Sequence, residues 1–264
     1  MCESQSAQAL ARVSQGFLSS VVFGHRLLVL SDAHVGATPP AVEEALLAFL
    51  ECAPTLGDCL LLNGDIFDFW FAYRRLIPRR GFEVAAAIRR VRRRMPVAMV
   101  GGNHDRWGED FWEQDLDVRF APLEMELTIG ERRVLAVHGD GVTESHWSAE
   151  LLQRITRHPA FVSLWRHAPP SFAFWVADRM SHSLGNTVRE EELLRAASER
   201  QRVWGELKLK DNPDLGCVVM GHTHRPVLTE PFPGRQFLNP GAWLDGFRYG
   251  VVTADGAELA VWGG

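Results

Sequence analysis

With 264 residues, the chain is long enough for one large domain with a full core, or for a domain that carries an insertion. Its composition, 46% hydrophobic and 23% charged, is that of an ordinary soluble globular protein, and the net charge of −5 argues against binding of nucleic acid over the whole surface. The four cysteines show no Cys-x-x-Cys spacing, which predicts free thiols and a reducing cytoplasm. No apolar run reaches the roughly 18–20 residues that span a bilayer, and residues 1–24 do not have the basic start and cleavage site of a signal peptide.

The first half of the chain alternates between predicted strands and predicted helices. Apolar runs predict strands over residues 26–31, 58–63 and 97–101. Between them, helical patterns cover residues 40–53 and 81–94, the first with apolar side chains at amphipathic spacing. Strand–helix–strand repetition is typical of α/β proteins with parallel strands.

The pattern changes after residue 117. Short strands over residues 123–129 and 132–138 predict a hairpin, and the region 216–262 is rich in strands separated by turns. We therefore expect an α/β domain over residues 25–262, built as a two-sheet β-sandwich flanked by helices.

Residues 147–208 interrupt this scheme with a helical pattern that is rich in aromatic side chains and interleaved with arginines. Because the segment separates the fourth and fifth of the ligand motifs described next, we predict a helical cap inserted into the domain, above the site. A subdomain that only packs against its neighbours would show the same pattern. The side chains in it that we expect to contact substrate are Arg154, Trp165, Phe172 and Trp175.

Five short segments place oxygen and imidazole ligands directly after predicted strands. They are Asp32-Ala33-His34, Gly64-Asp65-Ile66-Phe67-Asp68, Gly102-Asn103-His104-Asp105, His138-Gly139-Asp140 and Gly221-His222-Thr223-His224. A single segment is weak evidence, because Asp-x-His after a strand is often a turn with a surface histidine. Five of them in this order indicate a metal-dependent site that cleaves phosphoesters. The other histidines are expected at the surface or in packing contacts: His25, His146, His158, His167 and His182.

Hydrolysis of a phosphoester at neutral pH needs a hydroxide nucleophile and positive charge around the phosphoryl group, and two divalent ions about 3.5–4 Å apart supply both. Asp65 is the candidate carboxylate between the two ions. The pairs Asp32-x-His34 and His222-x-His224 hold ligands two residues apart, which project to the same side of an extended backbone and can converge on the ions.

The remaining candidates complete a mixed set of oxygen and nitrogen ligands. Asn103 offers a carbonyl oxygen and His138 an imidazole, a combination that suits Mn²⁺, Fe²⁺, Zn²⁺ or Ni²⁺ better than Ca²⁺. His104 is the candidate to stabilise the transition state or to protonate the leaving oxygen, with Asp105 orienting it. For Asp68 we expect a structural role.

These segments together resemble the motif set of the calcineurin-like metallophosphoesterase superfamily, in the superfamily's order and over residues 26–243. The resemblance implies a four-layer metallophosphoesterase fold with two divalent ions, for which we expect Mn²⁺. It assigns to one ion the ligands Asp32, His34, Asp65 and His224. It assigns to the second ion the ligands Asp65, Asn103, His138 and His222.

Within the superfamily, the chain is most similar to the UDP-2,3-diacylglucosamine pyrophosphohydrolase family of the lipid A pathway. The similarity lies in residues 64–70, in the aromatic insertion, and in residues 221–226 and 239–243. It implies that a nucleotide-linked lipid is cleaved to UMP and 2,3-diacylglucosamine 1-phosphate, with the insertion holding the acyl chains. The best-studied members have Arg where this chain has His104.

Two alternatives stay open. The first is a phosphodiesterase or phosphatase for a soluble nucleotide or a phosphoprotein. The second is a metal-free interaction module, but such a module is expected to lack some of the ligand residues, and all of them are present here. Residues 74–94 hold nine arginines and one acid, Glu83, which describes either a solvated helix face or a surface that contacts an anionic membrane. We expect a cytoplasmic protein, with peripheral contact to the inner membrane as a further expectation. Its substrate would be a phosphorylated small molecule or nucleotide-linked lipid, and not a nucleic acid.

Overall fold

The computed structural model of the chain describes residues 21–71, 73, 76–108, 110–143, 161, 165, 167–169, 172 and 191–263. Within these ranges, the helices are α2 (Pro40–Leu56), α3 (Phe82–Arg92), the π-helical turn η1 (Phe111–Asp115), α4 (Asp140–Thr143) and α8 (Glu191–Asp211). The strands are β1 (Arg26–Leu30), β2 (Cys59–Asn63), β3 (Val97–Val100), β4 (Arg119–Ala121), β5 (Glu124–Ile129), β6 (Arg132–Val137), β7 (Leu215–Val219), β8 (Val227–Phe232), β9 (Arg235–Asn239), β10 (Arg248–Thr253) and β11 (Ala257–Val261).

The elements expected in the first half of the chain are all present, with ends within three residues of the expected ones. Helix α2 begins at Pro40, where a residue without an N–H group leaves no hydrogen bond unmade. Its buried residues Leu46, Phe49, Leu50 and Ala53 recur at helical spacing and face the first sheet. Strand β2 is buried at every position, which fits a central strand that is covered on both faces.

The first sheet has the strand order β11-β10-β1-β2-β3-β4. Strands β1 to β4 run parallel, as the strand–helix–strand pattern predicts. Strand β10 joins the sheet antiparallel to β1, so the end of the chain returns to the side of its first strand. Neither β4 nor η1 was expected, because three to five residues are too few to show a period.

The second sheet has the order β5-β6-β7-β9-β8. The expected hairpin is confirmed: β5 and β6 pair antiparallel, from Glu124 opposite Val137 to Ile129 opposite Arg132. Strand β7 lies parallel between β6 and β9, and β8 closes the edge antiparallel to β9.

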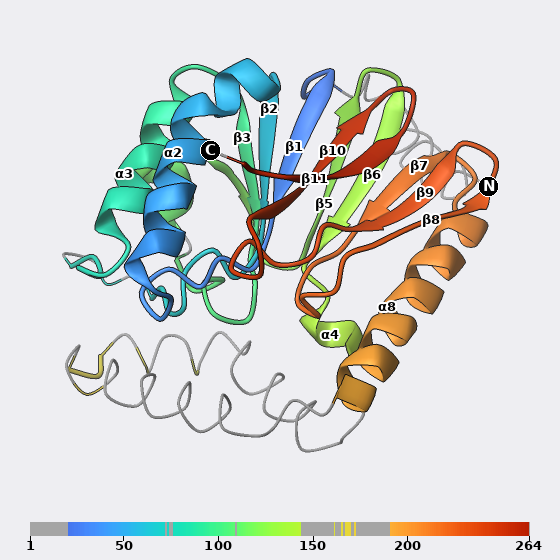
Figure 1. Cartoon of the computed structure of the whole chain (residues 1–264). Coiled ribbons are helices and arrows are strands. Elements are labelled where there is room, and N and C mark those ends of the chain that lie inside the picture. Colours follow the sequence, from blue (N-terminus) through green and yellow to red (C-terminus); the bar gives the residue numbers. More distant parts are fainter. Residues whose placement is uncertain are drawn as a thin grey trace, which may run out of the picture.

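The buried side chains form three clusters that separate four layers. One cluster lies between α2, α3 and the first sheet, and a second lies between the two sheets. The third lies between the second sheet and α8, where Leu209 packs with Val218 and Phe237. Figure 1 shows α2 and α3 on one side of the sandwich and α8 on the other. The expected two-sheet sandwich flanked by helices is confirmed.

The loops that follow β1, β2, β3, β6 and β7 come together, and hydrogen bonds join them. Asp32 N donates to Gly64 O (3.1 Å) and Gly221 N donates to His138 O (2.9 Å). His104 N donates to Asp65 Oδ1 (2.9 Å), which joins the loop after β3 to the loop after β2. No helix in the described ranges combines the length and apolarity that a membrane-crossing segment needs.

Candidate metal centre

The first two ligand segments run side by side beyond the ends of β1 and β2. Ala33 N and His34 N both donate to the carbonyl oxygen of Asp65, at 2.9 and 3.0 Å, and Val35 N donates to Ile66 O at 2.9 Å. These bonds continue the parallel pairing of the two strands into their loops. As a result, the Asp-x-His segment and Asp65 are fixed relative to one another before any side chain contributes.

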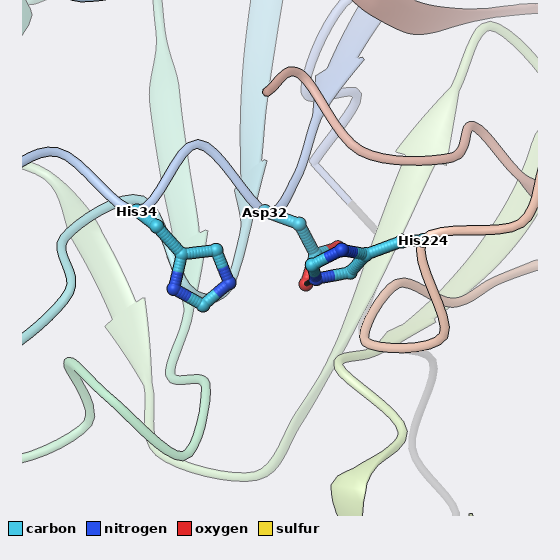
Figure 2. A group of neighbouring side chains, drawn as sticks. All are labelled: Asp32, His34 and His224. Atoms are coloured by element: carbon cyan, nitrogen blue, oxygen red, sulfur yellow. Dashed lines mark ion pairs between the residues drawn. The ribbon is translucent and has the colours of Figure 1, made fainter. Parts of the chain in front are cut away.

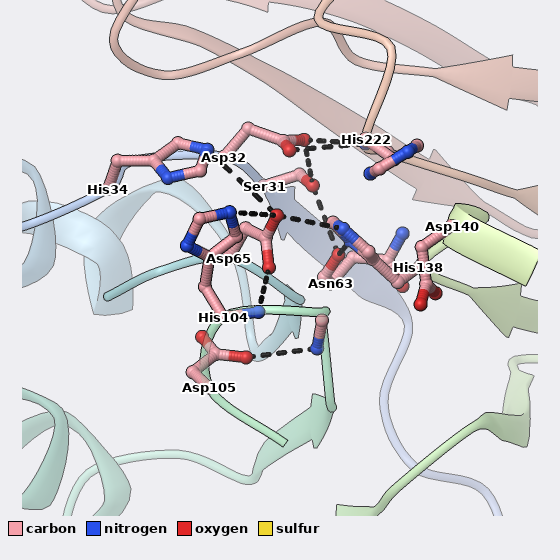
Figure 3. A network of polar contacts seen from close by, with 12 residues as sticks. Ser31, Asp32, His34, Asn63, Asp65, His104, Asp105, His138, Asp140 and His222 are labelled. Carbon is pink, nitrogen blue, oxygen red and sulfur yellow. Dashed lines mark hydrogen bonds and ion pairs between the residues drawn. The ribbon is translucent and has the colours of Figure 1, made fainter. Parts of the chain in front are cut away.

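The carboxylate of Asp65 lies at the centre of the cluster (Figure 3). Its Oδ2 is 3.1 Å from Nε2 of His138, 3.9 Å from Nε2 of His34 and 4.0 Å from Nε2 of His104. The three histidines come from the loops after β6, β1 and β3. A carboxylate approached from several sides by imidazole nitrogens is suited to bridge two cations.

The candidate ligands divide into groups on either side of Asp65. In one group, atoms of Asp32, His34 and His224 lie within 4.8 Å of one another, and Figure 2 shows these side chains together. Nε2 of His224 is 3.4 Å from Oδ1 of Asp32. Two further groups contain Asp65: one with His138 and His222, the other with His34 and His104. The Asp32–His34–His224 group corresponds to one of the two ion sites that the resemblance implies, and the Asp65–His138–His222 group corresponds to the other. Asp65 lies where it could bind both ions.

The backbone of the ligand residues differs from the extended form expected from the two-residue spacing. Five of the seven candidate ligands have left-handed backbone angles: Asp32 (φ 55°), His34 (φ 47°), Asp65 (φ 53°), His222 (φ 69°) and His224 (φ 58°). Such angles are uncommon outside glycine and cost free energy that surrounding contacts must offset. Their concentration here, with only Asp117 and Phe247 as other non-glycine cases in the described chain, marks a backbone shaped for a site.

The polar atoms of the centre fit divalent cations. Nδ1 of His138 contacts the carbonyl oxygen of Asn63 at 2.8 Å, so Nδ1 carries the hydrogen and Nε2 keeps its lone pair for a metal. Nε2 of His34, Nε2 of His138 and Oδ1 of Asn103 are buried and make no hydrogen bond within the described residues, and the two imidazole nitrogens face the Asp65 carboxylate. Buried polar atoms without partners are costly, and a bound cation would satisfy all three.

The electrostatics of the cluster favour positive charge. Burial raises the pKa of Asp32, but the hydrogen bond and charge of His224 outweigh it and lower the pKa to about 2. Burial also opposes ionisation of Asp65, yet His138 holds the pKa of Asp65 well below its usual range. Burial disfavours the charged form of His138, but the Asp65 carboxylate raises the pKa of His138 to about 10. Protons and metal ions compete for the same imidazole nitrogen, so these carboxylates also favour a divalent cation.

His222 has the opposite tendency. Burial, and next the charge of His138, lower the pKa of His222 to about 4, so its imidazole is neutral at physiological pH. A neutral imidazole is the form that binds a metal ion.

The ring of His104 is oriented by Asp68. Nδ1 of His104 lies 2.5 Å from the carbonyl oxygen of Asp68, which can only accept, so Nδ1 is the donor and Nε2 faces Asp65. Burial lowers the pKa of His104, but the charge of Asp65, together with the hydrogen bond to Asp68 and the charges of Asp68 and Asp105, more than offsets this and raises the pKa. This geometry leaves Nε2 as the atom of His104 that can hold a proton facing the centre.

Asp105 contacts backbone amides and not the ring of His104, so the expected orienting role belongs to Asp68. The carboxylate of Asp105 accepts hydrogen bonds from Gly102 N at 2.9 Å and from Ile66 N at 2.8 Å. Burial, and next the charge of Asp65, raise the pKa of Asp105 to about 6. Asp105 therefore joins the loop after β3 to the loop after β2.

A buried ion pair that the motifs did not indicate joins two more ligand loops. The guanidinium of Arg106 pairs with the carboxylate of Asp140, and its Nε donates to Gly102 O at 2.8 Å. Both side chains are less than 9% exposed. The only sequence signal for the pair was the presence of Asp140 in the His138-Gly139-Asp140 segment.

The expected substrate contacts are described only in part. Trp165 and Phe172 lie near one another, with ring centroids 6.3 Å apart, and Phe172 is half exposed. Arg154 and Trp175 lie outside the described residues. Among the other histidines, His25 and His167 are exposed, as expected, and His146, His158 and His182 lie outside the described residues.

A two-sheet sandwich with paired aspartate and histidine groups at its strand ends defines a metal-dependent hydrolase. The chain matches the family model of the calcineurin-like phosphoesterases over residues 25–226 and belongs to that family. A relative named UDP-2,3-diacylglucosamine hydrolase, from Shewanella piezotolerans, is 23% identical over 234 residues, which cover 89% of this chain and 97% of the relative. The Bordetella pertussis protein of that name is 28% identical, covering 76% of this chain and 78% of its own, and the one from Escherichia coli O6:H1 is 26% identical, covering 88% and 97%. With these relatives, the protein is identified as a phosphoesterase or pyrophosphohydrolase.

Solved structures similar to the chain include Vacuolar Protein Sorting 29 from Cryptosporidium parvum and the Escherichia coli phosphoesterase Yfce. Both have a TM-score of 0.40 and 15% identity and cover 90% of this chain; the match covers 96% of the first and 99% of the second.

Proposed function

We propose that the protein is a dinuclear-metal hydrolase that cleaves the diphosphate of UDP-2,3-diacylglucosamine. The observation that carries the proposal is the division of ligand groups on the two sides of Asp65, with buried Nε2 and Oδ1 atoms that have no other described partner. The ions would be held by Asp32, His34, Asp65 and His224, and by Asp65, Asn103, His138 and His222. When bound, two divalent ions lower the pKa of water and neutralise the phosphoryl oxygens, and we expect Mn²⁺, with Fe²⁺, Zn²⁺ or Ni²⁺ as alternatives.

The proposed role of His104 follows from its ring geometry. Hydrolysis breaks a P–O bond, and the leaving oxygen must gain a proton or be stabilised as an anion. With Nδ1 donating to the Asp68 carbonyl, Nε2 is free to hold a proton and to give it to the leaving oxygen. The raised pKa of His104 favours the protonated form that this step requires.

The lipid substrate is proposed from the names of the relatives and from the aromatic insertion. The products would be UMP and 2,3-diacylglucosamine 1-phosphate. The part of the 147–208 segment that precedes α8 would act as a cap of the 25–262 domain and hold the acyl chains through Arg154, Trp165, Phe172 and Trp175, whereas residues 191–208 lie in α8, which packs on the second sheet. For such a substrate we propose a cytoplasmic location with peripheral contact to the inner membrane. The half-exposed ring of Phe172 is consistent with an apolar ligand at that position.

The test is hydrolysis of UDP-2,3-diacylglucosamine with added Mn²⁺, beside bis(p-nitrophenyl) phosphate as a soluble diester, with UMP measured by chromatography. We expect kcat/KM for the lipid to exceed that for the diester by orders of magnitude. The variant Phe172→Ala should raise KM for the lipid alone, and Leu207→Ala, at an equally exposed site on α8, should change neither substrate. Cleavage of the diester without cleavage of the lipid would retain the phosphoesterase and refute the lipid assignment.

A further inference from the structure

A glutamine on α8 reaches the loop that carries two of the proposed metal ligands. Gln201 is fully buried, and its Nε2 donates to Gly221 O at 3.0 Å. Its Oε1 accepts from Thr223 Oγ1 at 3.0 Å. Gly221 precedes His222, and Thr223 lies between His222 and His224, so one side chain contacts the loop on both sides of His222.

Asn239, at the end of β9, completes the network from the other side. Its Nδ2 donates to Gly221 O at 2.9 Å and lies 3.1 Å from both Gln201 Oε1 and Thr223 Oγ1. A Cβ added at Gly139, the residue after His138, would collide with Nε2 of Gln201. The amide of Gln201 therefore lies against the loops after both β6 and β7.

The loop needs such support because of its backbone. His222 and His224 both have left-handed angles, and Thr223 N turns back to Gly221 O at 2.8 Å. Left-handed conformations of non-glycine residues persist only where neighbouring contacts over-determine them. The hydrogen bonds of Gln201 are contacts of this kind, and they come from a helix that contributes no ligand itself.

Helix α8 also contacts the ligand loops at two other points. Arg200 Nη2 donates to Thr143 O at 2.8 Å, at the end of α4, which follows the His138 segment. Arg225, directly after His224, pairs with Glu191 at the first turn of α8, with Nη1 and Oε1 2.6 Å apart. The position of α8 relative to these loops is thus fixed by contacts at three places.

We propose that Gln201 is a positioning residue that sets the geometry of His222 and His224 for metal binding. The inference rests on the proposed metal centre and adds to it a group outside the ligand motifs. Within the described residues, the hydrogen bonds of the Gln201 amide are made with Gly221, Thr223 and Asn239. Packing of α8 on the sheet is supplied elsewhere, by Leu209.

The test compares Mn²⁺ affinity, by isothermal titration calorimetry, between the unmodified chain and Gln201→Met, which fills the space but cannot make the hydrogen bonds. Loss of groups that orient metal ligands weakens metal binding by about 10–100-fold, and we expect a Kd at least about tenfold higher. The absorption spectrum of bound Co²⁺, which reports ligand geometry, should also shift. Thr223→Val, which removes the hydroxyl partner, should change both readouts in the same direction and serves if Gln201→Met does not fold.

Leu209→Ala is the matched control, because Leu209 is fully buried on the same helix, lies eight residues beyond Gln201 and belongs to the third cluster. It should lower the Tm and leave the Kd for Mn²⁺ unchanged. If folded Gln201→Met bound Mn²⁺ as tightly as the unmodified chain, or if Leu209→Ala weakened Mn²⁺ binding as much as Gln201→Met does, the positioning role alone would be overturned. Failure of the unmodified chain to bind Mn²⁺ would instead overturn the proposed metal centre and this inference together.

Discussion

A methyl group added at Gly102 should displace the central carboxylate. A Cβ at this position would lie 2.8 Å from Cγ of Asp65 and closer still to its Oδ1 and backbone nitrogen. Ordinary contact begins near 3.4 Å, so relief of the contact with Cγ alone requires Asp65 or the loop after β3 to move by about 0.6 Å, and the two closer atoms require a larger shift. The backbone of Gly102 is outside the left-handed region, so the collision is the reason that alanine is unfavourable there. Misplacement of a reacting group by about 1 Å costs roughly 100-fold in rate, and we expect Gly102→Ala to lower kcat/KM by about 10–100-fold.

The assay is hydrolysis of bis(p-nitrophenyl) phosphate with Mn²⁺, together with the Tm of each variant. Gly256→Ala is the control, because its Cβ would meet only Gln236, with the nearest atom at an ordinary 3.5 Å. The control should keep both its activity and its Tm. An unchanged kcat/KM in Gly102→Ala would refute the argument that the position of Asp65 limits catalysis.

Three other changes test the centre and the core. Asp65→Asn removes the carboxylate that we propose both ions share. It should weaken Mn²⁺ binding, measured by calorimetry, by more than the roughly 10–100-fold that loss of an orienting partner costs. Binding of two ions with the affinity of the unmodified chain would contradict the bridging role. Arg106→Met removes the guanidinium that pairs with the buried carboxylate of Asp140 and should lower the free energy of unfolding by about 3–5 kcal/mol in urea denaturation, with no change if the pair is not buried in solution. Burial raises the pKa of Cys217 to about 12, so at pH 8 its thiolate is scarce. A thiol reagent should therefore modify the partly exposed Cys52 before Cys217, as mass spectrometry of the folded protein would show.

Local patterns predicted most of the elements because each pattern was long enough to repeat. The fully buried run of β2 and the helical spacing in α2 each identify their element without knowledge of the rest of the chain. The strand β4 is too short for that, and only its pairing with β3 makes it a strand. The place of β10 beside β1 is likewise a property of the assembled sheet, since the residues of β10 do not by themselves show which strand they will pair with.

The sequence by itself determined which residues are candidate metal ligands, because each motif is a short segment whose residue types and position after a strand can be recognised locally. Asp32, Asp65 and His138 were identified in this way, and the structure brings them together. Tertiary contacts decided how those ligands are held. The left-handed backbone of Asp32 and Asp65, the orientation of His104 by Asp68, and the amide of Gln201 against the last ligand loop all depend on residues distant in the chain. No local pattern encodes such contacts, since they arise only when several strand ends meet at one edge of the sandwich.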